Sequence, residues 1–420
     1  MNLILYTTLF LYFFLPFQFA LNPVEGFDVA IIRIIIIFIV FLYLTIALWK
    51  RTLFIPKGWI ASFLLAFLMW IIFSLFYTPN LPWTARKIFF LLSISPIVLV
   101  LVSLFKNNPS TKIKLIKATV IGAFAITIIG IVQFTLQFIF SLNTILDLWS
   151  SFIPFFLGGT FSEAVIAHNS WLVHVGTIDL MRAIAFFPDP HIFSFYLGLI
   201  IPLALALYFI SKNKFWIICF VVLLLGDLLT FSRGGYIGIF SGFAIGFILL
   251  WPQIHTKIRH FVVLLLLSFV FILLIPNNPI TNRFSSSFDH TDTSNTHRIE
   301  LWSAAIEQIK ESPLIGTGLG GYAYIVNPRA NYRTPFYVHN LALDITVELG
   351  IIGLVLFFGI FISLLLTFYK NRTDFIALFS IISISIFLIH SIFDTPLFSV
   401  HIFPLLLLFI ALGISYENNQ

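Results

Sequence analysis

Charged residues that suit phosphate chemistry stand near the ends of apolar segments in this sequence. They are Arg182, Arg233, Arg298, Arg329, Arg333 and His339. A guanidinium group keeps its charge at all working pH values and offers a fork of N–H donors that fits phosphate oxygens. A neutral histidine can act as a base for a hydroxyl group. The set therefore predicts a site for a phosphate or diphosphate group next to a general base.

Arg233 lies in the run Ser-Arg-Gly-Gly at 232–235, between two apolar segments with almost no loop. Gly234 and Gly235 allow a close approach of the backbone, and the start of the following helix adds a partial positive charge. These features favour anion binding. An arginine at a membrane helix end can instead anchor that end in lipid headgroups. This alternative stays open, more so for Arg329 and Arg333 than for Arg233.

His339 and Asn340 begin a long apolar segment. The positive end of a helix and the nearby arginines both disfavour an imidazolium, so we expect a lowered pKa and a neutral His339 that can serve as a base. A capping or interfacial histidine is the alternative. Asp344 lies roughly 140° around the helix from His339, so the two are not an obvious pair. His390 and Asp394 fit a structural hydrogen bond at least as well as chemistry.

Other kinds of site find little support. The ten histidines include no His-Glu-x-x-His pattern, so we expect neither a metal site nor a cofactor. No phosphate-binding loop for ATP is present, and Ser232 is not in a Gly-x-Ser-x-Gly turn. Cys219, the one cysteine, lies in an apolar run and excludes a disulfide framework. The excess of 23 basic over 17 acidic residues indicates cytoplasmic loops and not nucleic-acid binding.

Composition determines what must position these residues. Of 420 residues, 60% are apolar and 10% are charged, and mean hydropathy is +1.05. Soluble domains carry about 25% charged residues. The sequence therefore predicts a single integral membrane domain over residues 1–420, an all-α polytopic bundle of transmembrane helices. Twelve runs have about the length of a span: 3–20, 28–48, 59–77, 88–105, 115–141, 191–210, 215–231, 235–251, 260–275, 338–368, 374–391 and 397–415.

Basic residues alternate between the connections of these runs. Thirteen lysines and arginines fall in five short connections, at 50–57, 106–117, 212–214, 257–259 and 370–372. Because short cytoplasmic loops collect positive charge, these connections and both termini are expected in the cytoplasm. Two long connections, 142–190 and 276–337, are then expected as periplasmic loops. We expect the first run to be a retained helix and not a signal peptide.

The second long connection has a pattern of its own. Apolar residues recur at helical spacing from Ile299 to Ile309, which predicts an amphipathic helix lying on the outer membrane face or on the bundle. The apolar positions are Ile299, Trp302, Ala305, Ile306 and Ile309. Ser312-Pro313 should end this helix, and the glycine-rich run 316–321 should form a tight turn.

Three motifs resemble a known family. They are Thr-His-Arg-Ile-Glu-Leu-Trp at 296–302, Ser-Pro-Leu-Ile-Gly-Thr-Gly at 312–318, and His339-Asn340 followed after nine residues by Gly350-Ile351-Ile352-Gly353. Together with the Ser-Arg-Gly-Gly run and the segment from Arg182 to His191, they are similar to the O-antigen ligase family of bacterial envelope enzymes. These landmarks extend over about 180–355, and the first five runs carry none.

The resemblance implies a glycosyltransferase of the bacterial inner membrane with its active site facing the periplasm. The donor would be a glycan linked to undecaprenyl diphosphate, and no metal or nucleotide sugar would take part. The acceptor would be a lipid A core, another glycan or another periplasmic molecule, in lipopolysaccharide or surface polysaccharide biosynthesis. A ligase is favoured. A polymerase of the same family is the close alternative, and a polysaccharide transporter or flippase is further from the pattern.

The resemblance also assigns roles to residues. Arg182, Arg233 and His339 match the family's functional arginines and histidine. Arg298 matches a frequent family position. We expect the remaining candidates to bind substrate together with Arg298: Arg329, Arg333, Gly234 and Asn340.

The expected topology can be tested with a reporter enzyme fused after Asn295. An enzyme that works only in the periplasm should be active there, because residues 276–337 are expected outside. A fusion after Arg372, in a basic short connection, is the control and should be inactive. Cytoplasmic activity at Asn295 would invert the topology.

Overall fold

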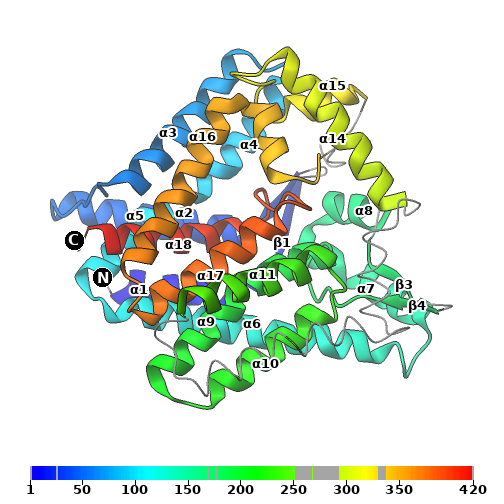
Figure 1. Ribbon diagram of the computed structural model, residues 1–420, viewed down its shortest axis with the longest axis horizontal. Helices are drawn as coiled ribbons and strands as arrows, with labels where there is room; N and C mark the ends of the chain where they lie inside the picture. Colours follow the sequence, from blue (N-terminus) through cyan, green and yellow to red (C-terminus); the bar gives the residue numbers. More distant parts are fainter. Residues whose placement is uncertain are drawn as a thin grey trace.

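A computed structural model describes residues 2–24, 27–167, 170–175, 178–250, 267, 293–329 and 337–418, and the described chain is mostly helical (Figure 1). The first helices are α1 (Asn2–Phe14), α2 (Ile31–Trp49), α3 (Trp59–Phe73), α4 (Leu81–Ile94), α5 (Ile97–Asn107), α6 (Ser110–Leu136), α7 (Leu142–Leu157) and α8 (Gly159–Ala167). They are followed by α9 (Pro190–Ser211), α10 (Phe215–Leu228), α11 (Arg233–Leu250), α14 (Thr293–Glu311), α15 (Gly321–Val326), α16 (Leu341–Lys370), α17 (Phe375–His390) and α18 (Phe403–Glu417). Short 3₁₀ helices, η1 (Leu15–Phe17) and η2 (Ser74–Phe76), extend α1 and α3.

The apolar runs predicted from the sequence are helical over most of their length where they fall in the described residues. Among the described residues, six helical segments are long and apolar enough to cross a membrane: 31–49, 59–76, 81–107, 110–136, 190–211 and 341–370. Six shorter apolar helices accompany them, at 2–17, 142–157, 215–228, 233–249, 375–390 and 403–417. The run 260–275 lies outside the described residues, apart from Leu267. An all-α membrane architecture is therefore confirmed in its main features, and the count of twelve spans stays a prediction.

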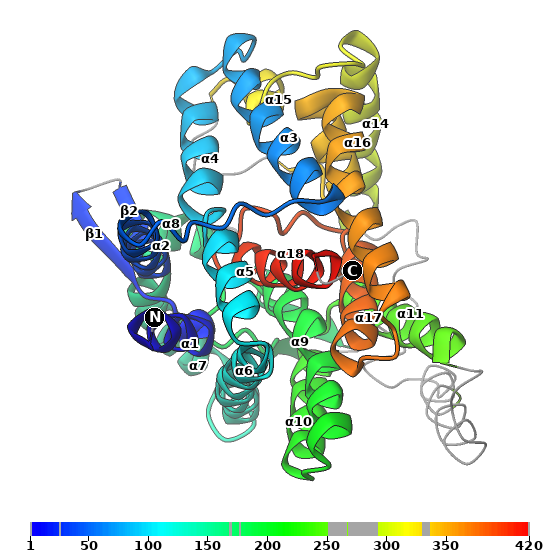
Figure 2. The same cartoon turned by 90° about the vertical axis from the view of Figure 1, so that its left-hand side faces the viewer.

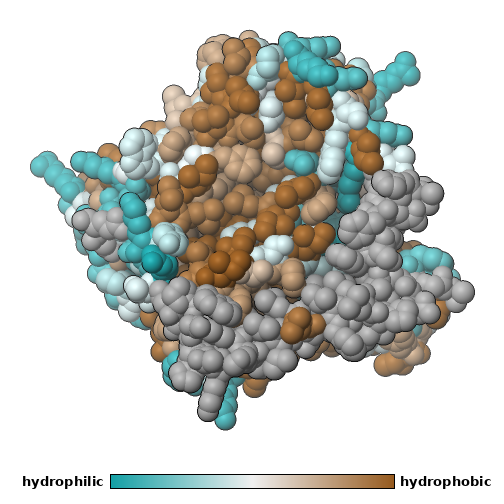
Figure 3. All heavy atoms as spheres, in the orientation of Figure 1, coloured by the Kyte–Doolittle hydropathy of each residue, from teal (hydrophilic) through white to brown (hydrophobic). Residues whose placement is uncertain are grey.

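The two ends of the molecule carry different parts of the chain. Both termini lie at the left end in Figure 1, and Figure 2 shows the two of them from that end. The α7–α8 region lies at the opposite end. Figure 3 shows hydrophobic side chains over the middle of one face, with hydrophilic residues at its left margin and upper right. This arrangement agrees with a serpentine of helices whose termini share one side.

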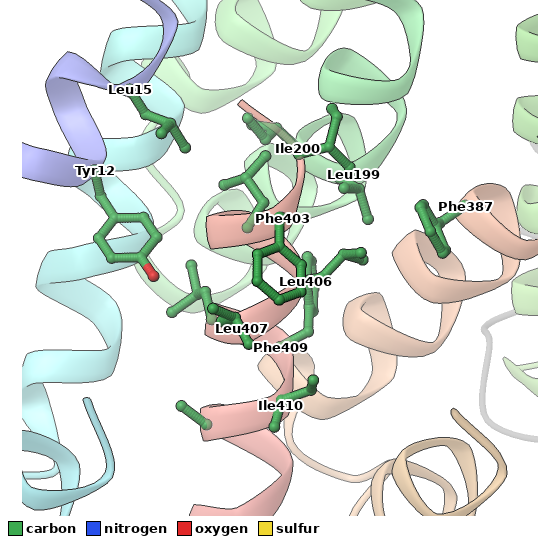
Figure 4. Close-up of a cluster of buried hydrophobic side chains, with 14 of the residues drawn as sticks. Tyr12, Leu15, Leu199, Ile200, Phe387, Phe403, Leu406, Leu407, Phe409 and Ile410 are labelled. Carbon is green, nitrogen blue, oxygen red and sulfur yellow. The ribbon is translucent and has the colours of Figure 1, made fainter. Parts of the chain in front are cut away.

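Helix α18 forms the centre of the bundle. Every residue from Phe403 to Ser415 is buried. Side chains from α1, α9 and α17 surround this helix, as Figure 4 shows for Tyr12, Leu199 and Phe387. The Tyr12 hydroxyl donates to the Pro404 carbonyl at 2.9 Å. A helix that is apolar on all sides belongs inside a membrane bundle, and α18 takes that place.

Two β-hairpins were not predicted. The first pairs β1 (Ala20–Val24) with β2 (Phe27–Ala30), and the second pairs β3 (Leu172–Val175) with β4 (Ile178–Met181). The second hairpin and helices α7 and α8 occupy much of the long connection 142–190. Asp28 of β2 accepts a hydrogen bond from the Phe161 amide at 2.9 Å, which attaches the first hairpin to the start of α8.

Helix α14 confirms the predicted amphipathic helix, and it ends at Glu311, just before Ser312-Pro313. It packs on the start of α16: Ala305 is buried there, and the Trp302 Nε1 donates to the Val338 carbonyl at 3.0 Å. The predicted apolar face is divided, however. Ile299 and Ile306 are about half exposed and point away from this contact.

Helix α16 is interrupted at Gly350, where φ is +67°. The break frees backbone groups, and the segment 313–318 binds them. The amides of Thr317 and Gly318 donate to the carbonyls of Val347 and Glu348 at 2.9 and 2.8 Å, and the Ile351 amide donates to the Pro313 carbonyl at 2.9 Å.

The glycine-rich turn after α14 is therefore a partner of α16 and not only a connection. Gly316, Gly318 and Gly320 all have positive φ values, between +71° and +86°, as the predicted tight turn requires.

Replacing Gly350 with alanine should destabilise the protein strongly. An added Cβ would lie 2.0 Å from the Leu314 carbonyl oxygen, and φ at this position disfavours any L side chain. We expect a loss of about 3 kcal/mol or more, measured as the fraction of monomeric protein that survives heating in detergent. Val355→Ala, on the exposed side of the same helix, is the matched control. Equal stability of the two variants would contradict this account of the break.

Candidate functional site

His339 lies at the start of α16 and contacts the segment after α17. Its backbone has φ of +53°, which is uncommon for a residue other than glycine. Asn340 caps the helix by accepting from the Leu343 amide at 3.1 Å, and the Leu341 amide donates to the Ser391 carbonyl at 2.9 Å. These bonds hold the His339 Nδ1 at 3.1 Å from the Asp394 Oδ1.

The His339–Asp394 pair defines how the imidazole can act. Burial alone would raise the pKa of Asp394, but its hydrogen bond to His339 and the charges of His339 and His191 hold that pKa well below its usual value. A carboxylate can only accept, so His339 Nδ1 carries the proton and Nε2 is the nitrogen that can take another. The His339 side chain is 40% exposed, so it can be reached from outside.

The predicted lowering of the His339 pKa is wrong. Burial and the charge of Arg298 do lower it, but the hydrogen bond and charge of Asp394 outweigh both, so the pKa is raised. The prediction rested on the arginines and the helix end, and the carboxylate 55 residues further along the chain reverses the direction of the pKa shift.

Asp344 supports both sides of this pair. Its carboxylate accepts from the Val338 amide at 2.9 Å, next to His339. It also accepts from the Thr395 hydroxyl, next to Asp394. Although Asp344 does not touch His339, it therefore fixes the two segments that bring His339 and Asp394 together. Glu348, one turn further along α16, pairs instead with Lys87 of α4 at 2.8 Å.

Arg182 is buried and binds backbone carbonyls. Its Nε donates to Thr230 at 2.6 Å and its Nη2 to Phe231 at 3.2 Å, both in the turn between α10 and α11. Its Nη1 donates to the Ser170 carbonyl at 3.0 Å. The Gln133 amide in turn donates to the Arg182 carbonyl at 2.9 Å. Arg182 thus holds in place the turn that carries Arg233.

Ser232 lies between two buried histidines. Its Oγ is 3.2 Å from the Nδ1 of His191 and 3.3 Å from the Nε2 of His390, and it accepts from the Gly235 amide at 3.3 Å. A hydroxyl donates once and accepts twice. With one acceptor position taken by the amide, Ser232 donates to one histidine and accepts from the other.

Gly234 lets α11 pack closely on α17. A Cβ there would lie 2.6 Å from the His390 Cδ2. Arg233 opens α11 and is largely buried beside Gly234. The positive end of α11 is therefore held against the His191–Ser232–His390 group.

Arg298 of α14 completes the group. Its charge acts on His339, His191 and His390, so all three histidines lie within its electrostatic range. The charges of Asp394 and Arg182 both act on the carboxyl group of Asp189, which caps α9. Burial and the Asp394 charge raise the pKa of Asp189 to about 6, against opposing hydrogen bonds and the charge of Arg182.

The structure therefore brings together four of the predicted residues with partners that the sequence did not reveal. Arg298 and His339 share one electrostatic neighbourhood with Arg182, and Arg233 follows the turn that Arg182 holds. Arg329 is exposed at the end of α15, and Arg333 lies outside the described residues. Asp394, His191, His390 and Ser232 were not predicted as parts of the site. They are distant in sequence from His339, and only the fold joins them.

The fold and site define a polytopic membrane protein with a histidine–carboxylate pair beside arginines. Residues 218–358 match the model of the family described as O-antigen ligase, so the resemblance read from the sequence is confirmed over this segment. The segment contains Arg233, Arg298 and His339 and excludes Arg182 and Asp394.

Curated relatives agree with this family match. A Rickettsia conorii protein named "Putative polysaccharide ligase RC0486" is 37% identical over 82 residues, which cover 17% of this chain and 20% of that protein. Proteins of similar name from Rickettsia felis and Rickettsia prowazekii are 38% and 35% identical over 82 residues, with the same coverage. The chain thus spans about a fifth of the length of the curated relatives it matches.

Removing the Asp394 charge should lower the pKa of His339, because that charge stabilises the imidazolium. The titration midpoint of labelled His339, followed by NMR in detergent, should move to lower pH in Asp394→Asn. Asp179→Asn, at an exposed carboxylate paired with His174, is the control and should leave the midpoint in place. An unchanged or higher midpoint in Asp394→Asn would contradict the pairing.

Proposed function

We propose that this protein is a ligase-type glycosyltransferase that moves a glycan from undecaprenyl diphosphate to a hydroxyl of an acceptor on the periplasmic side. The observation that carries the proposal is the His339–Asp394 pair, which is partly exposed and lies within the electrostatic range of Arg298. A base beside permanent cations suits a reaction in which a hydroxyl attacks and a diphosphate leaves. The match to the O-antigen ligase family supports the same class of reaction.

In the proposed step, the acceptor oxygen attacks the anomeric carbon of the donor sugar. The new carbon–oxygen bond forms as the bond from that carbon to the diphosphate oxygen breaks. His339 Nε2 takes the proton of the acceptor hydroxyl, and Asp394 stabilises the imidazolium that results. The electron pair of the broken bond leaves with the undecaprenyl diphosphate.

The arginines would stabilise the charge that grows on the diphosphate. Arg233 begins α11, so its guanidinium and the helix start can act on the same anion. Arg298 lies within range of His339 and can contact the other side of the leaving group. We propose that Arg182 contributes in two ways, through its charge and by holding the turn that carries Arg233. With this positive charge in place, transfer would need no metal.

The remaining predicted residues would bind the rest of the substrates. Arg329 and Arg333 would meet phosphate or glycan groups beyond α15, and Gly234 and Asn340 would line the backbone side of the site. The acceptor would be a lipid A core or another periplasmic glycan. In a polymerase of the same family the same residues would act, and the acceptor would be a second lipid-linked glycan.

Replacing His339 with alanine should stop transfer and leave donor binding. We expect a fall in rate of about 10²–10⁴, the usual effect of losing a general base. The assay uses purified protein in nanodiscs with lipid-linked glycan and acceptor, and donor binding is measured separately.

Arg233→Lys is the comparison variant. Lysine keeps the charge and loses the bidentate fork, so this variant should weaken donor binding as well as transfer.

Full transfer by His339→Ala would remove the histidine from the mechanism. Low abundance with normal specific activity in the surviving protein would make its role structural. Loss of donor binding in parallel with transfer would make it a diphosphate ligand.

A further inference from the structure

A pocket of about 560 Å³ lies at the end of the molecule that carries both termini. It is formed by α1, α2, α5, the first turn of α6 and the connection after α2. It is far in the chain from His339 and from the arginines of the candidate site. The proposed glycan transfer makes no use of it.

The charged residues around this pocket are all basic. Lys50 and Lys106 line it, and no aspartate or glutamate is among the described residues that line it. The Lys106 Nζ lies 4.0 Å from the centre of the Phe54 ring, a cation–π contact that holds the ammonium group in place. Thr111 lines the pocket from the first turn of α6, and Asn108, which also lines it, caps that helix by accepting from the Ser110 amide at 3.1 Å. The pocket therefore favours an anion.

Polar uncharged residues and apolar side chains make up the rest of the lining. Leu5, Ile46, Ala47 and Leu104 come from three helices of the bundle and lie beside the basic rim. A free phosphate would use only the rim. A phospholipid would place its phosphate at the lysines and the start of an acyl chain along these side chains. Basic pockets between membrane helices are suited to anionic headgroups in this way.

We propose that this pocket binds the phosphate group of an anionic membrane phospholipid, held by Lys50 and Lys106. The site is separate from the proposed transfer site and stands without it.

The test measures phosphatidylglycerol binding to the purified full chain in detergent, by native mass spectrometry and by thermal stabilisation. Lys50→Gln/Lys106→Gln should weaken binding at least tenfold. Lys57→Gln/Lys114→Gln is the matched control, since both lysines are exposed, do not line the pocket and carry the same charge. It should bind as the unaltered protein does.

Equal binding of phosphatidylcholine, or equal loss in the control pair, would overturn the proposal. Stabilisation by inorganic phosphate that matches the lipid would overturn the phospholipid as the occupant.

Discussion

A membrane interior offers no water to backbone groups, so an interruption of a helix there must be repaired by other protein atoms. At the break in α16 at Gly350, the segment 313–318 supplies hydrogen-bond partners for the freed backbone groups. The Trp70 Nε1 also donates to the Leu349 carbonyl at 2.9 Å. This repair ties the region after α14 to the middle of α16. Because α14 also packs on the start of α16, Arg298 and His339 are held on one rigid frame.

Much of the helical architecture was predictable, because long apolar runs in a sequence indicate membrane helices. The end of α14 and the glycine turn at 316–321 were predictable too, since proline and glycine act locally. The join between that turn and α16 was not. It depends on register between segments about 30 residues apart, and nothing in the periodicity of either segment encodes it. The two hairpins were not predicted because their strands are only four or five residues long. Those of the first hairpin also overlap the ends of apolar runs.

The site was predictable only in its charged members. Arginines and a histidine at segment ends stand out in an apolar chain, and His339 was found in this way. Its carboxylate partner was not, because Asp394 belongs to a different helix connection and the helical spacing of Asp344 drew attention elsewhere. The error in the pKa of His339 has the same origin. Proton affinity depends on the nearest charge in space, and sequence distance is a poor guide to that.

Arg182 donates to three backbone carbonyls, two of them in the turn before Arg233. The candidate site therefore depends on a residue outside the segment that matches the family. The segment that matches the O-antigen ligase family starts after Arg182 and ends before Asp394. The turn before Arg233 is nevertheless shaped by the first of these residues, and His339 is oriented by the second. A chimera that exchanged only the matched segment between relatives would detach the site from both of its supports. The unit that can be inherited or transplanted intact is therefore larger than the unit that sequence similarity delimits, and it extends from the β3–β4 hairpin to the connection before α18.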